Sequence, residues 1–420
     1  MEIDAAQYAL ISMEMGFTKS FLEVYQQGND YLDKPPLLFW LSSASMLLFG
    51  LTNFAYKLPS VLIALLGIYS TYKFAKDYYG QDKAILAALI LGSCQAMFLI
   101  TNDVRTDTNL LGLTMFSIWQ LSSFIKTNSW KHLILASLGL GGAMMAKGPI
   151  ALIIPAAAFG TEFLLKREWK NIFKYQWLIL LIIIGITLIP MCYGLYTQFD
   201  LHPEKTVYQL EGPSGLRFFF WTQSFGRITG EIYWDNNTGP YYFLHTILWD
   251  FQPWIFLFIP ALFQKIRRLI TNRLRPLNGE EYITVGGFIL MFIALSSSNY
   301  KLPHYIFVLF PFASIITASY IYDLKNQLAD KVSKFQFGIT HLLWVAIALV
   351  YIIVFPPTSF IQPSIFIILF IQTWVVFKRI KNPTWRIFIP TLITAISFNL
   401  MMAIQFYPNL LKFQATSQAG

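Results

Sequence analysis

The sequence carries little charge. Of its 420 residues only 13% are Asp, Glu, Lys or Arg, whereas 55% are hydrophobic and 17% are aromatic. A soluble domain has about a quarter of its residues charged, so this composition excludes an ordinary soluble protein. Several hydrophobic stretches approach the length of about 20 residues that spans a bilayer as a helix. The sequence therefore predicts an all-α polytopic membrane protein.

Cysteine is scarce as well. Cys94 and Cys192 lie inside or at the edge of apolar stretches and have no metal-binding spacing. The first 20 residues lack the apolar core of a cleavable signal peptide. Aromatic girdles and alternating ten-residue segments are missing too, which argues against a β-barrel.

About twelve apolar stretches are expected to form membrane-spanning helices. They cover residues 58–76, 84–101, 108–125, 133–146, 149–165, 176–197, 241–264, 282–298, 303–322, 338–355, 364–377 and 387–406. Placing the loops after the first, third and every further odd helix in the cytoplasm gives most of the 31 Lys and Arg residues to that side. The net charge of +9 is therefore attributed to membrane topology, and no nucleic-acid partner is expected.

This topology divides the chain into two parts. Residues 1–57 form an extracytoplasmic juxtamembrane segment, and residues 58–410 form a helix bundle that includes an outer loop at 198–240. A separate soluble C-terminal domain is not expected. Because residues 1–57 begin outside without a helix before them, we expect a helix that precedes Met1 to be missing; unaided translocation of the segment is the alternative.

Basic residues on the predicted outer side run against the usual charge rule. They are Lys19, Lys34, Lys57, Arg105, Lys147, Lys205, Arg217, Arg227, Lys301 and Lys412. Several lie at helix ends in the short polar motifs DKPP, NDVRTD, MAKGP and SNYKLPHY. Charged residues at a membrane boundary usually mark a site, and an outward-facing surface that binds phosphate would account for these together.

Each of these motifs also has a purely structural interpretation. Asp4 could cap a helix that lies on the membrane surface. Asp33 and Lys34 could pair with each other, although an exposed pair contributes only about 0–1 kcal/mol, whereas a lysine is a common ligand for phosphate. The segment TNDVRTDTN could be a solvated turn, or an acidic cluster that orients a substrate or holds a divalent cation.

Two further segments stay open in the same way. Lys147 precedes Gly148 and Pro149, which suit a turn between helices, but such a turn does not need an outward lysine. The run GLRFFFWTQSFGRITG in the long outer loop could be an interfacial helix alone.

The order of these motifs along the chain resembles that in the GT-C glycosyltransferases that use a polyprenyl-phosphate-linked sugar. The resemblance is to the bacterial branch, with the aminoarabinose transferase of lipid A and relatives of the protein O-mannosyltransferases, and it covers about residues 1–320. It rests on Asp4 with Tyr8 and Ala9, then Tyr31, Asp33, Lys34 and Pro35, then Asp107, Lys147-Gly148, Arg227, and Lys301-Leu302-Pro303 with Tyr305.

The resemblance implies a GT-C helix bundle with juxtamembrane helices on its outer face, and a role for each matched residue. Asp4 is the implied catalytic carboxylate, and Lys34 and Arg227 are implied to bind the lipid phosphate. The surrounding phosphate pocket is implied to contain Tyr31, Lys147, Lys301 and Tyr305. Asp33 and Asp107 match acids that order the site, in some members with a metal ion.

The sequence also departs from the family. A histidine of the lipid A enzyme's outer loop is absent, and Gln223, Ser224 and Asn237 occupy that region. No cofactor is therefore certain, and a divalent metal ion held by Asp33 and Asp107 stays open. A Gly-rich phosphate loop is absent as well, which argues against a nucleotide-sugar donor.

The resulting hypothesis is a multi-pass glycosyltransferase of the cell (inner) membrane. It would move a sugar from a polyprenyl-phosphate donor to a hydroxyl of a protein, lipid or glycan acceptor on the extracytoplasmic, periplasmic side, by one inverting displacement. The alternative is a lipid or solute transporter or flippase. A third possibility is a ligase that acts on polymer chains at the same face and shares the fold but not the donor. Internal repeats and broken helices at mid-membrane are typical of transporters, and the sequence shows no clear repeat.

Overall fold

The computed structural model describes residues 3–223, 226, 238–273, 279–357 and 359–413. The chain begins with two helices. They are α1 (Ile3–Thr18) and α2 (Leu37–Phe49), and between them runs a hairpin of β1 (Tyr25–Gln26) and β2 (Asn29–Asp30). Tyr25 pairs with Asp30, and the turn residues Gln27 and Gly28 both have positive φ, which is the backbone of a tight two-residue hairpin turn.

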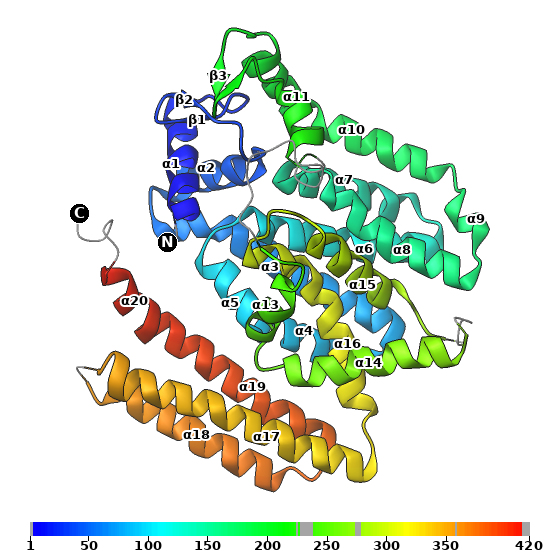
Figure 1. The fold of residues 1–420 in the computed structure, drawn as a ribbon, viewed down its shortest axis with the longest axis vertical. Coiled ribbons are helices and arrows are strands. Elements are labelled where there is room, and N and C mark those ends of the chain that lie inside the picture. Colours follow the sequence, from blue (N-terminus) through cyan, green and yellow to red (C-terminus); the bar gives the residue numbers. More distant parts are fainter. Residues whose placement is uncertain (1–2, 224–225, 227–237, 274–278, 358, 414–420) are drawn as a thin grey trace.

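The first half of the bundle is built from helices that run back and forth. They are α3 (Asn53–Tyr79), α4 (Gln81–Ser93), α5 (Gln95–Asn102), α6 (Thr106–Thr127), α7 (Trp130–Lys147), α8 (Ile150–Lys166), α9 (Trp169–Ile172) and α10 (Gln176–Leu195), which continues as the π-helical turn η1 (Tyr196–Asp200). Figure 1 shows α1, α2 and the first hairpin on the opposite side from α9.

A second hairpin and further helices follow. They are the hairpin β3 (Thr206–Val207) and β4 (Leu210–Glu211), the short α11 (Gly215–Arg217) and η2 (Phe218–Thr222), then α13 (Tyr242–Asp250), α14 (Ile255–Thr271), α15 (Ile283–Ser296), the 3₁₀ turn η3 (Pro303–Leu309) and α16 (Phe310–Asp323). The main hydrophobic core lies among α3 to α8 and α13 to α16.

The last three long helices form their own cluster. They are α17 (Asn326–Leu349) with η4 (Val350–Val354), α18 (Ile361–Arg379), and α19 (Pro383–Met401), which continues through η5 (Met402–Phe406), α20 (Tyr407–Leu410) and η6 (Leu411–Phe413). The cluster packs around Trp344, Tyr351 and Phe398. Asn399 ties it to the main bundle by donating a hydrogen bond to the Ser93 carbonyl at 2.9 Å.

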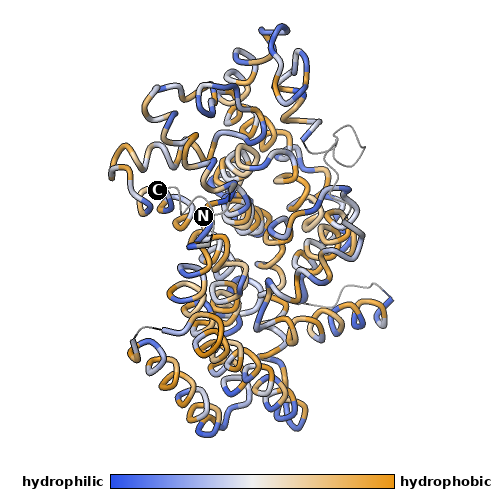
Figure 2. The backbone as a smooth tube through the Cα atoms, turned by 60° about the vertical axis from the view of Figure 1, so that its left-hand side comes forward, coloured by the Kyte–Doolittle hydropathy of each residue, from blue (hydrophilic) through white to orange (hydrophobic). Residues whose placement is uncertain are grey.

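The expected all-α membrane bundle is confirmed. Within the described residues, six helical segments are long and apolar enough to cross a bilayer: Asn53–Tyr79, Trp169–Asp200, Pro303–Asp323, Asn326–Val354, Ile361–Arg379 and Pro383–Leu410. Figure 2 shows hydrophobic residues along most of the helices and hydrophilic residues near many of their ends. The large exposed apolar side chains of α10, α17 and α18 suit a lipid environment.

Two stretches expected as continuous helices are broken. The stretch 84–101 bends by 53° between α4 and α5, at Cys94. The stretch 241–264 forms α13 and α14 with a break at residues 251–254, where Pro253 has no N–H to continue a helix. The hydrophobic run at 37–49, which was not expected to be a span, forms α2 and packs on α1.

Candidate active site

The start of α6 and the end of α7 bring a carboxylate and an ammonium group together. The two helices are joined by a short turn at Asn128, so the start of α6 meets the end of α7. Asp107 lies in the first turn of α6, and Lys147 is the last residue of α7, where Gly148 with φ of 84° ends the helix. The Lys147 ammonium forms an ion pair with the Asp107 carboxylate, which is 5% exposed. The helix dipoles favour both charges at these ends.

The turn η3 covers this pair. Pro303 begins the turn, and the next two residues point toward Asp107 and Lys147. His304 Nε2 lies 3.7 Å from Asp107 Oδ2, and the Tyr305 ring lies with its centroid 3.9 Å from Lys147 Nζ. A cation over an aromatic face is held by the ring quadrupole, so Tyr305 fixes the position of the lysine.

An arginine links two more acids beside this pair. Arg105, directly before α6, is largely buried and lies between the first helix of the chain and the end of α5. Its Nη1 is 3.2 Å from Asp4 Oδ2, and its Nη2 is 3.0 Å from Asp103 Oδ2. Asp4 keeps 44% of its side chain exposed, so its carboxylate is held in place and still open to a substrate.

The loop before α2 supplies a second lysine. Pro35 and Pro36 follow Lys34, and α2 starts at Leu37, as expected for prolines at a helix start. Lys34 Nζ is 2.8 Å from Asp33 Oδ2, and the other Asp33 oxygen accepts a hydrogen bond of 3.1 Å from the Gln223 amide. The loop is therefore linked to the distant outer segment that ends at Gln223.

Side chains from each of these segments line one cavity of about 160 Å³. Its polar wall is formed by Asp4, Lys34, Arg105, Asp107, Lys147 and Tyr305, and Gln223 and His304 also line it. The remaining wall is apolar and comes from α8 and α15, with Ile150, Ile153, Met291 and Leu295 among its residues. The cavity thus pairs a charged end with an apolar side, which suits an amphiphilic ligand that carries an anionic group.

The electrostatics of the cavity favour a carboxylate that can accept a proton. Burial raises the pKa of Asp4 above its ordinary value; the cation of Lys34 opposes this, and the carboxylates of Asp33 and Asp107 add to it. Burial also raises the pKa of the neighbouring Tyr8 phenol, so that hydroxyl stays neutral. A carboxylate with a raised pKa beside fixed cations is a sensible general base.

The other predicted residues lie outside the cavity wall or outside the described part of the chain. Tyr31 is buried, with its ring edge-on to Phe39. Lys301 is 3% exposed, and its Nζ donates a hydrogen bond of 2.9 Å to the Thr238 carbonyl. Arg227 lies outside the described residues. Their phosphate-binding roles stay predictions, as do the roles that the resemblance implies for the residues in the cavity wall.

Three cavity residues received no role from the sequence. Arg105 was noted only as an outward base, and its link to Asp4 joins residues 101 positions apart. His304 lies in the motif KLPHY between Lys301 and Tyr305, which were both chosen, so its position in that motif could have identified it. Gln223 reaches the site across 190 residues, and no local pattern indicates such a contact.

A metal site finds little support in these side chains. Asp107 is engaged by Lys147 and His304, and Asp33 by Lys34 and Gln223. Among the residues that the structure describes, no group of three or more His, Cys, Asp or Glu side chains is placed to hold a metal ion. The divalent ion that the family resemblance left open therefore does not fit the residues described.

Comparison with known proteins gives a consistent result. Residues 33–193 match the family described as dolichyl-phosphate-mannose-protein mannosyltransferase. The undecaprenyl phosphate-alpha-4-amino-4-deoxy-L-arabinose arabinosyl transferase of Edwardsiella ictaluri is 26% identical over 331 residues, which are 77% of this chain and 56% of that protein. The Proteus mirabilis enzyme of the same description, numbered 2, is also 26% identical, over 84% of this chain and 61% of that protein. The chain thus spans about three fifths of the length of these relatives.

Solved structures establish the fold. The structure of ArnT from Cupriavidus metallidurans bound to undecaprenyl phosphate superposes with a TM-score of 0.71 at 18% identity, covering 96% of this chain and 73% of that one. The apo structure of the same protein gives 0.72. The GT-C fold and the resemblance predicted from the sequence are therefore confirmed.

Proposed function

We propose that this chain, with its GT-C fold, is a membrane glycosyltransferase. It transfers a sugar from a polyprenyl-phosphate donor to an acceptor hydroxyl on the extracytoplasmic side of the membrane. The observation that carries the proposal is the shared cavity, whose wall contains the half-open carboxylate of Asp4 together with the lysines Lys34 and Lys147. The relatives named as arabinosyl transferases and the matched mannosyltransferase family support the same reaction class.

The donor fits the cavity through its two unlike parts. Lys34 supplies a cation for the lipid phosphate at the polar end, and the apolar wall of α8 and α15 accepts the first isoprene units. A lysine binds phosphate as a point charge. The undecaprenyl phosphate bound to ArnT is a ligand of that protein, and it defines the donor class to test here.

The chemistry follows from charge development. The acceptor oxygen forms a bond to the anomeric carbon while the bond from that carbon to the phosphate oxygen breaks, and the phosphate leaves with the electron pair. Fixed cations near the departing oxygen stabilise the transition state more than the ground state; Lys34 and Lys147 take this role. The hydroxyl proton passes to the Asp4 carboxylate. One displacement of this kind inverts the anomeric configuration.

Purified protein in lipid nanodiscs tests the proposal directly. It is incubated with polyprenyl-phosphate pentoses and hexoses and with a membrane extract as acceptor, and released polyprenyl phosphate and glycosylated products are measured by mass spectrometry. Wild-type protein is expected to consume a donor, and the Asp4→Asn variant is expected to be slower by about 10²–10⁴-fold. Consumption of none of these donors, together with unchanged glycoconjugates in cells that lack the gene, overturns the proposal.

The same assay separates a transferase from a transporter. A flippase moves its lipid without breaking the sugar–phosphate bond, so it releases no free polyprenyl phosphate. Vesicles with a labelled lipid-linked sugar inside one leaflet report movement independently of chemistry. Movement that persists in the Asp4→Asn variant without any product favours the transporter.

A further inference from the structure

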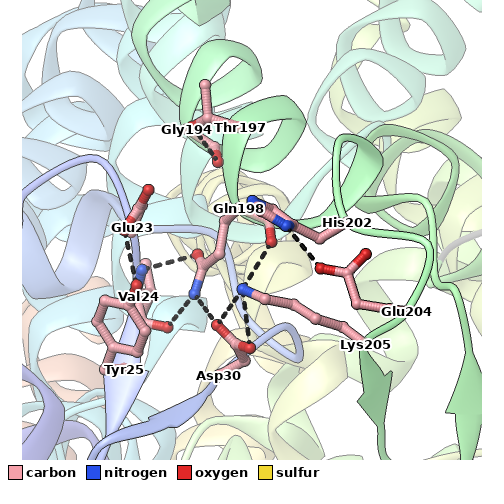
Figure 3. Close-up of polar contacts among 10 residues, drawn as sticks. All are labelled: Glu23, Val24, Tyr25, Asp30, Gly194, Thr197, Gln198, His202, Glu204 and Lys205. Atoms are coloured by element: carbon pink, nitrogen blue, oxygen red, sulfur yellow. Dashed lines mark hydrogen bonds and ion pairs between the residues drawn. The ribbon is translucent and has the colours of Figure 1, made fainter.

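The segment that carries Lys34 is fastened to the end of α10 by one buried side chain. Gln198 lies in η1, the turn that continues α10, and is 2% exposed. Its Oε1 accepts a hydrogen bond of 2.9 Å from the Val24 N–H, and its Nε2 donates one of 2.9 Å to the Val24 carbonyl (Figure 3). The amide therefore satisfies both backbone groups of one residue, 174 positions away in the chain.

The first hairpin contributes a second contact to the same place. Gln198 Nε2 also donates a hydrogen bond of 2.8 Å to Asp30 Oδ1, and Lys205 Nζ lies 3.0 Å from Asp30 Oδ2. Lys205 reaches back to the Gln198 carbonyl at 3.0 Å. Figure 3 shows Val24, Asp30 and Lys205 converging on Gln198. We call Val24, Asp30, Gln198 and Lys205 the outer clamp.

The outer clamp leads directly to the cavity. The Val24 carbonyl that Gln198 binds also accepts a hydrogen bond of 3.0 Å from the Tyr31 N–H. Three residues later comes Lys34, and Asp33 beside it accepts a hydrogen bond from Gln223, which also lines the cavity. The loop that presents Lys34 is thus fixed at its base by Gln198 and near its tip by Gln223.

A glycine shows how closely the two segments approach. A Cβ atom on Gly194, in the last turn of α10, would lie 2.1 Å from the Leu22 carbonyl oxygen, well inside van der Waals contact. The sequence therefore keeps α10 close enough to the first loop for Gln198 to reach Val24. By contrast, His202 and Glu204 in the same outer segment form an exposed pair at 2.8 Å, with Glu204 68% exposed.

From these contacts we propose that Gln198 is a positioning residue for Lys34. The inference rests on the proposed function, because Lys34 matters only if it binds an anionic donor. Without the clamp the loop samples positions in which Lys34 is away from the cavity, and donor binding must select the competent fraction. The apparent donor affinity then falls by that fraction while the bound complex reacts as before.

Two measurements on full-length protein in nanodiscs test the proposal. Hydrogen–deuterium exchange of residues 22–34 reports the clamp without reference to function. In Gln198→Leu the amides of Val24 and Tyr31 are expected to exchange about tenfold faster. Steady-state kinetics with the polyprenyl-phosphate sugar then give an expected rise in donor KM of about fivefold, with kcat changed less than about twofold. A loss of folded protein alone would lower the rate without changing KM.

Matched variants keep the test sharp. Glu204→Gln removes the exposed pair of the same segment and is expected to change neither exchange nor KM. Gly194→Ala separates the two segments and is expected to reproduce Gln198→Leu. Gln198→Glu places a carboxylate against Asp30 and is expected to raise KM, and adding Asp30→Asn restores an amide–carboxylate contact and lowers KM again.

The outcomes distinguish the two proposals. Unchanged exchange in Gln198→Leu overturns the clamp whatever the protein does. Faster exchange with a donor KM equal to that of wild type overturns the positioning role, as does an equal KM rise in Glu204→Gln. If wild-type protein uses none of the donors, the proposed function fails and the positioning role fails with it, while the exchange result still decides whether the clamp exists.

Discussion

Lys147 and Asp107 form an ion pair across the ends of two neighbouring helices, and the lysine ammonium also lies over the Tyr305 ring. Both charges are mostly withdrawn from water. A pair in this position has two roles that mutations can separate. It holds the ends of α6 and α7 together, and it places a cation in the wall of the cavity that Asp4 also lines.

The first prediction separates these two roles. Lys147→Met leaves Asp107 charged and buried, and such an uncompensated charge costs about 3–5 kcal/mol of folding free energy. The double variant Lys147→Met/Asp107→Asn removes both charges and is expected to recover most of the thermal stability without recovering transferase activity. Thermal unfolding in detergent and the donor-release assay measure the two effects. A double variant that regains activity would contradict the role of Lys147 as a cation for the donor.

The second prediction concerns the general base. Asp4→Asn preserves the size of the side chain and removes the proton acceptor, so kcat is expected to fall by about 10²–10⁴-fold with little change in donor KM. Asp82→Asn is the matched control, since Asp82 accepts a hydrogen bond from Tyr322 at a distance from the cavity. An Asp4→Asn enzyme with a kcat near that of wild type would remove Asp4 from the mechanism.

The third prediction is a pH dependence with a defined sign. The base must be ionised, so activity falls as the pH drops through the pKa of Asp4, which burial has raised. The cation of Lys34 lowers that pKa. Lys34→Met therefore raises it further, and the acid limb of the kcat profile is expected to move to higher pH. An acid limb that stays in place or moves to lower pH in Lys34→Met would show that Asp4 is not the titrating group.

The sequence indicated part of the cavity wall, but it did not indicate where the helices bend. Charged residues in short motifs at helix ends were selected because a bilayer makes such charges costly. One cavity is lined by five of the selected residues: Asp4, Lys34, Asp107, Lys147 and Tyr305. Hydropathy measures how much apolar length a segment has and not whether it bends. The breaks at Cys94 and at residues 251–254 were missed for that reason.

The contacts that organise the site could not be predicted from the sequence alone. Arg105 joins Asp4 to Asp103, and Gln198 joins the first loop to α10, through side chains far apart in the chain. A single sequence gives the type of each residue but no register between distant segments. Likewise the run at 37–49 has the composition of a short span, and its packing on α1 could not be derived from the sequence.

The fourth prediction tests the packing that holds the site in place. At Gly112 in α6 a Cβ atom would lie 2.2 Å from the Ile63 carbonyl oxygen of α3, so the two helix backbones are nearly in contact. Small residues permit such close approach between membrane helices. Gly112→Ala must push α3 away from α6, and overpacking of this kind costs about 1–3 kcal/mol.

Gly160 in α8 provides the matched control, because a Cβ atom there meets nothing within 4 Å. Gly160→Ala adds the same methyl group without a clash and gains helix propensity, so its unfolding temperature should equal or exceed that of wild type. Gly112→Ala is expected to unfold at a lower temperature and, since α6 carries Asp107, to lose activity in proportion to the folded fraction. If the two variants unfold at the same temperature, the α3–α6 contact is looser than the structure shows, and the position of Asp107 must be set by its pair with Lys147 instead.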